Sequence, residues 1–362
     1  MSHHNFAPRL LALGWNAARE IESATALTNG LQPARILAQH RDRYVVGTSD
    51  SDIEAVLRGS ARLDATSLNT PTVGDWVSVW RRDDHLAVIV ELLPRRSVFV
   101  RQSAGETTMP QVVAANIALA LIATAVVGDL NPRRLERYAI LAWESGATPV
   151  ILLTKSDLAS SEELAYARVA AAQSAPGVEI VSVSTRSGAG LEELSRLLVP
   201  GTTAALIGSS GVGKSTLVNA LLGAEQLRTR DVRDDGKGRH TTTHRELVRL
   251  ASGASLIDTP GMRELQLWSE GDGLAAAFVD IASLTAECHF RDCAHGAEPD
   301  CAVQRAIELG VLDAARLESY RALRREVAWL ATRSNVLASV EAKRRVKVIH
   351  RAVNAEARRR PK

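Results

Sequence analysis

The chain lacks long hydrophobic runs and has very few cysteines. Its longest apolar stretch, Ile117 to Val127, is shorter than the ~20 residues that a membrane-spanning helix needs. Residues 1–9 lack the apolar run and cleavage site of a secretory signal. Only three cysteines occur among 362 residues, and an odd number argues against a disulfide framework. We therefore expect a cytoplasmic protein without a membrane segment.

A large excess of charge of one sign is also absent, since the formal net charge is +3. The distribution is uneven, however, because Lys and Arg far outnumber Asp and Glu from Arg316 onward. The last stretch contains Lys343-Arg-Arg345, Lys347, Arg351 and Arg358-Arg-Arg360. A basic end on a nearly neutral protein favours a polyanionic partner such as RNA or DNA, with a solvated tail as the alternative.

The first third of the chain predicts a small β-barrel after a short lead-in. Residues 1–33 form a helical or irregular lead-in, and residues 34–105 contain short β-type runs separated by turns. These runs are Ala34–His40, Arg43–Gly47, Ile53–Arg58, Asp75–Arg82 and His85–Leu93. Strands of this length and spacing are typical of an oligonucleotide-binding (OB-type) barrel.

The barrel sequence also mixes basic and aromatic residues, which suits single-stranded nucleic acid. The basic residues are Arg35, Arg41, Arg43, Arg58, Arg62, Arg81 and Arg82, and the aromatic ones are Tyr44, Trp76, Trp80 and Phe99. A small barrel needs an aromatic core and solvated Arg residues in any case. The pattern therefore leaves RNA contact and plain barrel packing both open.

The remaining two thirds predict an α/β domain followed by helices. Residues 106–272 alternate apolar strand runs with helical stretches, as in a doubly wound sheet. The strand runs are Ala118–Val126, Pro149–Leu153, Glu179–Val183, Ala204–Ile207, Glu246–Leu250 and Ser255–Ile257. The helical stretches are Arg133–Ser145, Glu162–Ser174, Leu191–Leu198 and Lys214–Leu222. Residues 273–335 predict a helical domain around a cysteine-bearing loop, and residues 336–362 a basic helix or tail.

A phosphate-binding loop follows the apolar strand Thr203–Ile207 and opens a helix, which is the context that this motif requires. Its glycines let backbone N–H groups turn toward phosphates. Lys214 is expected to reach the β- and γ-phosphates, and Ser215 to supply a hydroxyl to Mg²⁺. The candidate nucleotide-binding residues here are Gly208, Ser209, Ser210, Gly211, Val212, Gly213, Lys214, Ser215 and Thr216.

A second motif indicates guanine. Thr154, Lys155, Ser156 and Asp157 close an apolar strand and resemble Asn-Lys-x-Asp, in which the aspartate accepts hydrogen bonds from guanine N1 and N2. Thr154 replaces the usual Asn, so the tie from this loop to the phosphate loop is expected to be weaker. Ser184 and Thr185 follow the next strand and fit the loop whose backbone supports guanine O6.

The third element is Asp258-Thr-Pro-Gly261, in which Asp258 is expected to hold the Mg²⁺ shell and Gly261 to sense the γ-phosphate. Upstream lies a glycine-rich, polar loop whose Thr242 or Thr243 fits a switch threonine that binds Mg²⁺ in the triphosphate state. Met262 stands where many GTPases place the glutamine that orients water. A methionine cannot do this, so His240 or a partner must supply the group, or intrinsic hydrolysis is slow.

These motifs stand in an unusual order. The base reader precedes the phosphate loop, whereas an ordinary GTPase has the phosphate loop first and the base reader last. Each motif nevertheless ends its own predicted strand. This arrangement predicts a circularly permuted GTPase domain.

All three cysteines gather with one histidine within fourteen residues, as Cys288, Cys293, His295 and Cys301. Three thiolates and one imidazole make a closed tetrahedral zinc set of the structural type. Buried structural cysteines, the alternative, do not explain this crowding.

Together these elements resemble the circularly permuted GTPases of the RsgA type, which assist maturation of the small ribosomal subunit. The elements that carry the resemblance, from about Ala34 to Leu330, also include Val73–Val77, Gln111–Asn116 and Gly238–Thr243. The resemblance implies an OB-type barrel, a permuted GTPase centre and a helical zinc domain. It also implies one structural Zn²⁺, Mg²⁺ with GTP, and hydrolysis of GTP to GDP stimulated by the small subunit and its rRNA. We expect a monomer.

Two alternatives remain on the sequence alone. An ATP-dependent P-loop kinase would use the same phosphate loop, but it leaves the guanine reader and the cysteine cluster unexplained. An RNA-binding scaffold with a vestigial nucleotide site is opposed by intact Lys214, Ser215, Asp258 and Asp157. A preference for ATP over GTP would favour the kinase.

Overall fold

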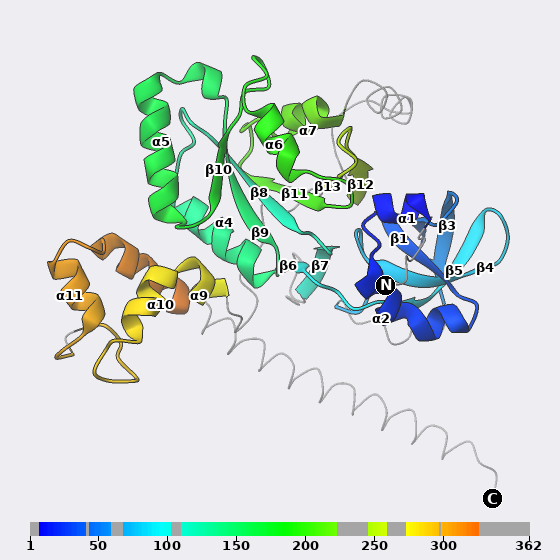
Figure 1. Ribbon diagram of the computed structural model, residues 1–362, viewed down its shortest axis with the longest axis horizontal. Helices are drawn as coiled ribbons and strands as arrows, with labels where there is room; N and C mark the ends of the chain where they lie inside the picture. Colours follow the sequence, from blue (N-terminus) through cyan, green and yellow to red (C-terminus); the bar gives the residue numbers. More distant parts are fainter. Residues whose placement is uncertain are drawn as a thin grey trace, which may run out of the picture.

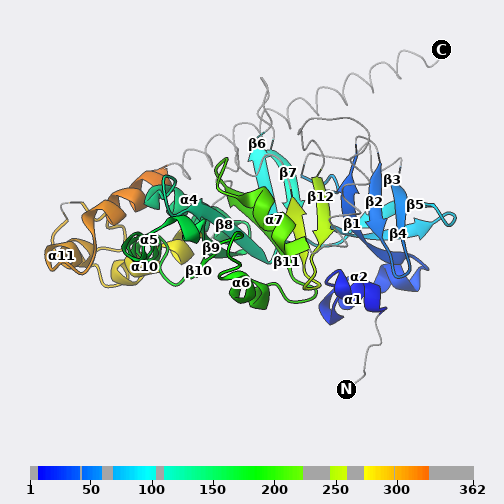
Figure 2. The ribbon, with the colours of Figure 1, turned by 90° about the horizontal axis from the view of Figure 1, so that it is seen from above.

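The computed structural model describes residues 7–40, 43–58, 68–102, 110–222, 245–258, 273–296 and 298–325. A β-barrel, a central α/β unit and a helical region with the cysteines follow one another across the molecule, so the barrel and the helical region lie on opposite sides of the α/β unit (Figures 1 and 2). The predicted fold class is confirmed. Among the described helices, none is long and apolar enough to cross a membrane.

The barrel has five strands that close on themselves. They are β1 (Gln32–Gln39), β2 (Tyr44–Gly47), β3 (Asp52–Leu57), β4 (Trp76–Arg81) and β5 (Leu86–Leu92). Their order is β1-β2-β3-β5-β4, and β4 pairs with β1 to close the ring. Alternate apolar residues point inward, among them Ile36, Val46, Ile53, Val77 and Ile89, all fully or almost fully buried.

The lead-in forms two helices, α1 (Pro8–Ala12) and α2 (Ala17–Thr28). Pro8 starts α1, and the Asn16 side chain caps α2 by accepting a hydrogen bond from the Arg19 N–H. The helices pack on the barrel through a second small core in which Trp15 and Trp76 meet edge to face at 4.9 Å. The lead-in is therefore part of the folded unit.

Several of the barrel residues suggested for RNA contact are internal. Arg35, Tyr44, Trp76 and Phe99 are buried, and Phe99 belongs to the core of the α/β unit rather than to the barrel. For these four residues the packing alternative holds, because their side chains are buried and cannot reach RNA. Trp80 is 55% exposed and stays available. Arg41 and Arg62 lie outside the described residues.

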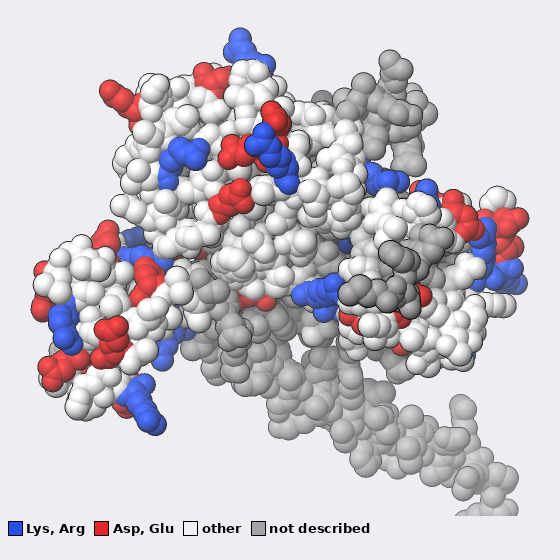
Figure 3. All heavy atoms as spheres, in the orientation of Figure 1, with Lys and Arg blue, Asp and Glu red and all other residues white. Residues whose placement is uncertain are grey.

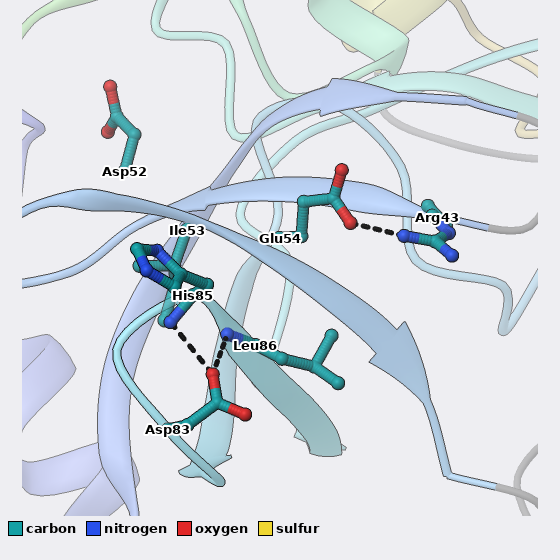
Figure 4. A pocket seen from close by; sticks show the side chains of 7 residues that line it. All are labelled: Arg43, Asp52, Ile53, Glu54, Asp83, His85 and Leu86. Carbon is teal, nitrogen blue, oxygen red and sulfur yellow. Dashed lines mark hydrogen bonds and ion pairs between the residues drawn. The ribbon is translucent and has the colours of Figure 1, made fainter.

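The outer face of the barrel is electrically mixed. Arg9 pairs with Asp52, Arg43 with Glu54, and Arg81 with both Asp50 and Asp84. Blue and red side chains accordingly lie side by side over the barrel in Figure 3. An open groove there is lined by Arg43, Asp52, Ile53, Glu54, Asp83, His85 and Leu86 (Figure 4). Its carboxylates outnumber its guanidinium group, so it does not suit a phosphate.

The α/β unit has a mostly parallel sheet. Strands β10 (Glu179–Ser182), β9 (Thr148–Thr154), β8 (Leu119–Ala125), β11 (Thr203–Gly208) and β13 (Ser255–Asp258) run parallel, and β12 (Arg245–Arg249) is antiparallel beside β13. Helices α4 (Pro132–Glu144) and α5 (Ser161–Ser174) cover one face. Helices α6 (Leu191–Leu197) and α7 (Lys214–Leu222) cover the other.

Local sequence accounts for this layering. Alternate residues of β8 divide between the two faces: Ala120 and Ile122 pack with α4, and Leu121 and Ala123 pack with α7. Asn131 caps α4 ahead of Pro132, and Ser160 with Glu163 forms a capping box at the start of α5. The doubly wound prediction is confirmed.

Two features of the strand arrangement were not predicted from the sequence. Strands β6 (Val98–Gln102) and β7 (Pro110–Ala115) form a separate hairpin between the barrel and the α/β unit. Strand β12 pairs with barrel strand β1, with Ala38 opposite Glu246 and Gln39 opposite Arg245. This pairing joins the barrel and the α/β strands into one 11-stranded sheet.

The cysteine region is helical, with α9 (Gly273–Ala277), α10 (Val279–Thr285), α11 (Ala302–Glu308) and a further helix over residues 314–325. It packs on α4 through Phe278, Ile281 and Val303, which belong to the same hydrophobic core as Leu135 and Tyr138. The region is therefore joined to the α/β unit by a continuous apolar core.

Candidate nucleotide-binding site and metal centre

The predicted motifs converge at one edge of the sheet. The phosphate loop follows β11, the base-reading tetrapeptide follows β9, and Ser184 with Thr185 follows β10. Asp258 is the last residue of β13. Because these strands are parallel, their carboxyl ends meet at the same edge, where α/β proteins bind ligands. The parallel sheet therefore brings together motifs that are far apart in the sequence.

Glycine conformations shape the phosphate loop. Gly208 has φ +149°, and a Cβ there would lie 2.3 Å from the carbonyl oxygen of Ala123 on β8, so no larger residue fits. Gly211 and Gly213 also have positive φ values, +79° and +97°. Lys214 opens α7 and folds back, so that its Nζ donates to the carbonyl oxygen of Gly208 at 2.8 Å and to that of Ser209.

The base reader is tied directly to the phosphate loop. The buried Thr154 hydroxyl donates to the carbonyl oxygen of Val212 at 2.7 Å, with the carbonyl oxygen of Thr124 at 3.2 Å. Lys155, held at φ +54°, donates from Nζ to the carbonyl oxygen of Gly211 at 2.7 Å. A hydroxyl therefore makes the connection that the replaced Asn was expected to make.

The two base-side loops are also connected to each other. The Ser184 hydroxyl donates to Asp157 Oδ1 at 2.6 Å, and the Ser156 N–H donates to the carbonyl oxygen of Val183 at 3.2 Å. Ser184 Oγ in turn accepts the N–H groups of Arg186 and Ser187. Ser184 thus orients the Asp157 carboxylate through its side chain, a contact that its predicted backbone role did not include.

The structure adds Asp129, which no motif indicated, to the phosphate loop. Asp129 lies in the loop between β8 and α4, and its carboxylate accepts a hydrogen bond from Ser209 Oγ at 2.7 Å. An isolated Asp in a polar loop carries no sequence signal. Of the remaining predicted residues, Thr242, Thr243 and Gly261 lie outside the described residues, as do His240 and Met262.

The cysteine cluster has the geometry of a tetrahedral metal site. The Sγ atoms of Cys288, Cys293 and Cys301 and a ring nitrogen of His295 all lie within 4.8 Å of one another. Cys288 Sγ is 3.9 Å from Cys301 Sγ, and His295 Nδ1 is 3.7 Å from each of these two sulfur atoms. Ligands at the usual ~2.3 Å from a tetrahedral zinc are separated by roughly 3.8 Å, so the four side chains fit such an ion.

The surroundings prepare His295 to bind a metal through Nδ1. Its Nε2 lies 3.2 Å from Thr285 Oγ1, whose own proton goes to the carbonyl oxygen of Ile281. Thr285 therefore accepts from Nε2–H and leaves Nδ1 without a proton. Burial lowers the pKa of His295, which also favours the neutral imidazole that a metal requires. Backbone N–H groups of His295 and Gln304 point at the sulfur atoms of Cys293 and Cys301.

Comparison with known proteins agrees with this geometry. The model of the family described as RsgA GTPase matches residues 92–268. Small ribosomal subunit biogenesis GTPase RsgA 2 of Lactiplantibacillus plantarum is 45% identical over 318 residues, which cover 87% of this chain and 89% of that protein. The chain belongs to the RsgA GTPase family. The RsgA protein of Syntrophotalea carbinolica is 41% identical over 348 residues, which cover 94% of this chain and 95% of that protein.

Two solved protein structures have a fold similar to that of this chain. YjeQ from Thermotoga maritima superposes with a TM-score of 0.64 at 26% identity, covering 82% of this chain and 99% of its own. YloQ, described as a circularly permuted GTPase, superposes with a TM-score of 0.61 at 26% identity, covering 84% and 96%. The predicted resemblance to the circularly permuted GTPases of the RsgA type is therefore confirmed.

Proposed function

We propose that this GTPase binds the small ribosomal subunit and assists its late maturation, hydrolysing GTP to GDP and phosphate under stimulation by the subunit. The observation that carries the proposal is the tie between base reader and phosphate loop through Thr154 and Val212. Such a tie serves a site that reads guanine and phosphates together. The relatives named above are small ribosomal subunit biogenesis GTPases, which supplies the partner.

In the proposed site, Asp157 reads guanine, with Lys155 stacking its aliphatic stem over the base, and Ser184 and Thr185 support the base from the next loop. The residues from Gly208 to Thr216 hold the phosphates. Mg²⁺, when bound with GTP, neutralises charge on the β- and γ-phosphates, and Ser215, Asp258 and one of Thr242 or Thr243 are its proposed protein partners. Gly261 is the proposed γ-phosphate sensor.

We propose one structural Zn²⁺ at Cys288, Cys293, His295 and Cys301. Four protein ligands leave no position for substrate, which supports a structural rather than a catalytic ion. The ion would hold the loop between α10 and α11 and so fix the helices around it.

The proposed partner surface includes rRNA, contacted by the barrel and the zinc region from opposite sides of the GTPase domain. Exposed Trp80 is the barrel residue best placed for base stacking. We propose the division expected from the sequence, into residues 1–33, 34–105, 106–272, 273–335 and 336–362, with β6 (Val98–Gln102) at the junction of the second and third parts. We also propose a monomeric state and a cytoplasmic location.

The decisive experiment measures GTP hydrolysis with and without purified small ribosomal subunits, and with large subunits as the control. We expect small subunits to raise kcat well above the slow intrinsic rate, and Lys214→Ala to abolish both rates. Equal rates with and without small subunits would refute the ribosomal role. Tighter binding of ATP than of GTP would refute the guanine assignment and favour the kinase alternative. If the protein bound neither nucleotide, the RNA-binding scaffold with a vestigial nucleotide site would be favoured.

A further inference from the structure

We propose that Asp129 is a positioning residue for the nucleotide, which holds the first turn of the phosphate loop through Ser209. The inference rests on the proposed use of the phosphate loop. Ser209 directly follows Gly208, and its hydroxyl donates to Asp129 Oδ1 at 2.7 Å. The bond joins the phosphate loop to the segment between β8 and α4, which belongs to none of the recognised motifs.

Asp129 is itself held from several sides. Arg134, in the first turns of α4, lies 2.8 Å from the same Oδ1 and also donates to the Asp129 carbonyl oxygen. The Thr124 hydroxyl at the end of β8 is 3.0 Å from that carbonyl oxygen and 3.2 Å from Oδ2. The Asp129 side chain is 21% exposed and that of Arg134 27%. A carboxylate fixed in this way presents one oxygen at a set position to Ser209.

With the hydrogen bond between Ser209 and Asp129, the phosphate loop is held from both sides. Thr154 and Lys155 hold the carbonyl groups of Val212 and Gly211 on the base side. On the other side Asp129 holds Ser209, whose carbonyl oxygen also accepts from Lys214. A loop fixed at both ends before binding loses less conformational entropy when its N–H groups close on phosphates. Asp129 therefore favours binding of GTP and of GDP.

Charge alone predicts the opposite effect. A carboxylate next to a site for a triphosphate repels it, and the Arg134 guanidinium offsets that repulsion in part. If Asp129 acted only through its charge, its removal would tighten nucleotide binding. If it acts by positioning Ser209, its removal weakens binding. The sign of the change therefore separates the two.

The test uses the full-length protein and fluorescent N-methylanthraniloyl GTP and GDP. We expect Ser209→Ala and Asp129→Ala each to weaken both nucleotides about fivefold, the effect of one hydrogen bond. The double variant should be no weaker than either single one, because both remove the same bond. Asp129→Asn keeps an acceptor oxygen and should bind more tightly than Asp129→Ala.

In steady-state kinetics, the loss should appear in KM rather than in kcat. Glu192→Ala, which breaks the exposed pair with Arg196, is the matched control and should bind like wild type. Unchanged or tighter binding by Ser209→Ala and Asp129→Ala overturns the inference, and so does a double variant whose loss is the product of the single ones. If wild-type protein itself fails to bind GTP, the proposed function falls.

Discussion

At the scale of single residues, one hydroxyl replaces an amide in the proposed guanine-reading motif. An Asn amide has two protons to donate, whereas Thr154 has one and directs it to Val212. Its methyl group and Oγ1 are buried at the end of β9, where the residue is 4% exposed. The Thr154 side chain thus contributes one hydrogen bond of ordinary length to the phosphate loop, in a site protected from water.

We predict that Thr154→Val, which keeps the shape but removes the hydroxyl, weakens GTP and GDP binding about fivefold. The Val212 carbonyl oxygen would lose its donor in a buried position. Thr154→Ser retains the donor and should stay within about twofold of wild type. Isothermal titration calorimetry with GTP measures both variants. Equal affinity of the Val and Ser variants would show that the hydroxyl contributes nothing.

At the scale of elements, helix α4 contacts two different parts of the protein. Arg134 in its first turns meets Asp129 beside the phosphate loop, and Glu136 meets Arg316 of the helix over residues 314–325. The Arg316 guanidinium also donates to Asp280 and to the carbonyl oxygen of Ala277, and it lies 4.6 Å from the Phe278 ring centre. Burial raises the pKa of Glu136, and Ser319 and Arg316 oppose that shift.

Arg316 therefore joins the cysteine region to the GTPase domain, rather than forming part of the basic surface that the sequence suggested. We predict that Arg316→Ala lowers the free energy of unfolding by about 3 kcal/mol, because it leaves Glu136 and Asp280 without their cation. Arg196→Ala breaks an exposed pair and should change it by less than about 0.5 kcal/mol. Urea denaturation compares them, and a similar small loss in both variants would contradict the joining role.

At the scale of the whole molecule, the barrel is fixed to the GTPase domain by polar contacts that are partly or fully buried. Asn116, at φ +57°, donates from Nδ2 to the carbonyl oxygen of Gly74 at 3.0 Å and accepts from Arg19 at 2.6 Å. Arg35, whose pKa is lowered by burial, reaches the carbonyl oxygens of Gly74 and Asn116. Val73–Val77 and Gln111–Asn116, two of the segments on which the sequence resemblance rests, therefore meet at this junction.

Gly74 tests the junction because no side chain fits there. Its φ is +89°, and a Cβ would lie 2.1 Å from the carbonyl oxygen of Ala115. We predict that Gly74→Ala costs about 3 kcal/mol or more, from backbone strain and overpacking together. Gly30→Ala has a similar φ of +77° with nothing within 4 Å, so it should cost only about 1 kcal/mol. Calorimetric unfolding measures the loss of stability in each variant. Equal losses would show that the backbone at the junction can shift to accommodate a Cβ at Gly74.

The pairing of β12 with β1 is a second connection between the barrel and the GTPase domain. β12 begins just after the Thr242 and Thr243 loop, so the strand that leaves the predicted switch is hydrogen-bonded to the barrel. In the sequence, the barrel is connected to the GTPase domain by the chain that precedes Ala118. A second connection was not predictable, because strand partners far apart in the chain leave no mark in local periodicity.

The sequence by itself determined most of the elements, the motifs and the family. Alternation of apolar residues predicted the barrel strands and the doubly wound sheet, and residue types at fixed spacing predicted the phosphate loop, the guanine reader and the Cys288–Cys301 cluster. These features are local, so neighbouring residues carry their signal.

Only the tertiary structure decided which side chains meet. It turned Arg35, Tyr44, Trp76 and Phe99 inward, because burying a ring or a hydrogen-bonded guanidinium depends on distant neighbours. It brought Asp129 to Ser209 and Arg316 to Glu136, pairs separated by 80 and 180 positions. Such contacts depend on how elements pack in three dimensions, and no local pattern of residues specifies them.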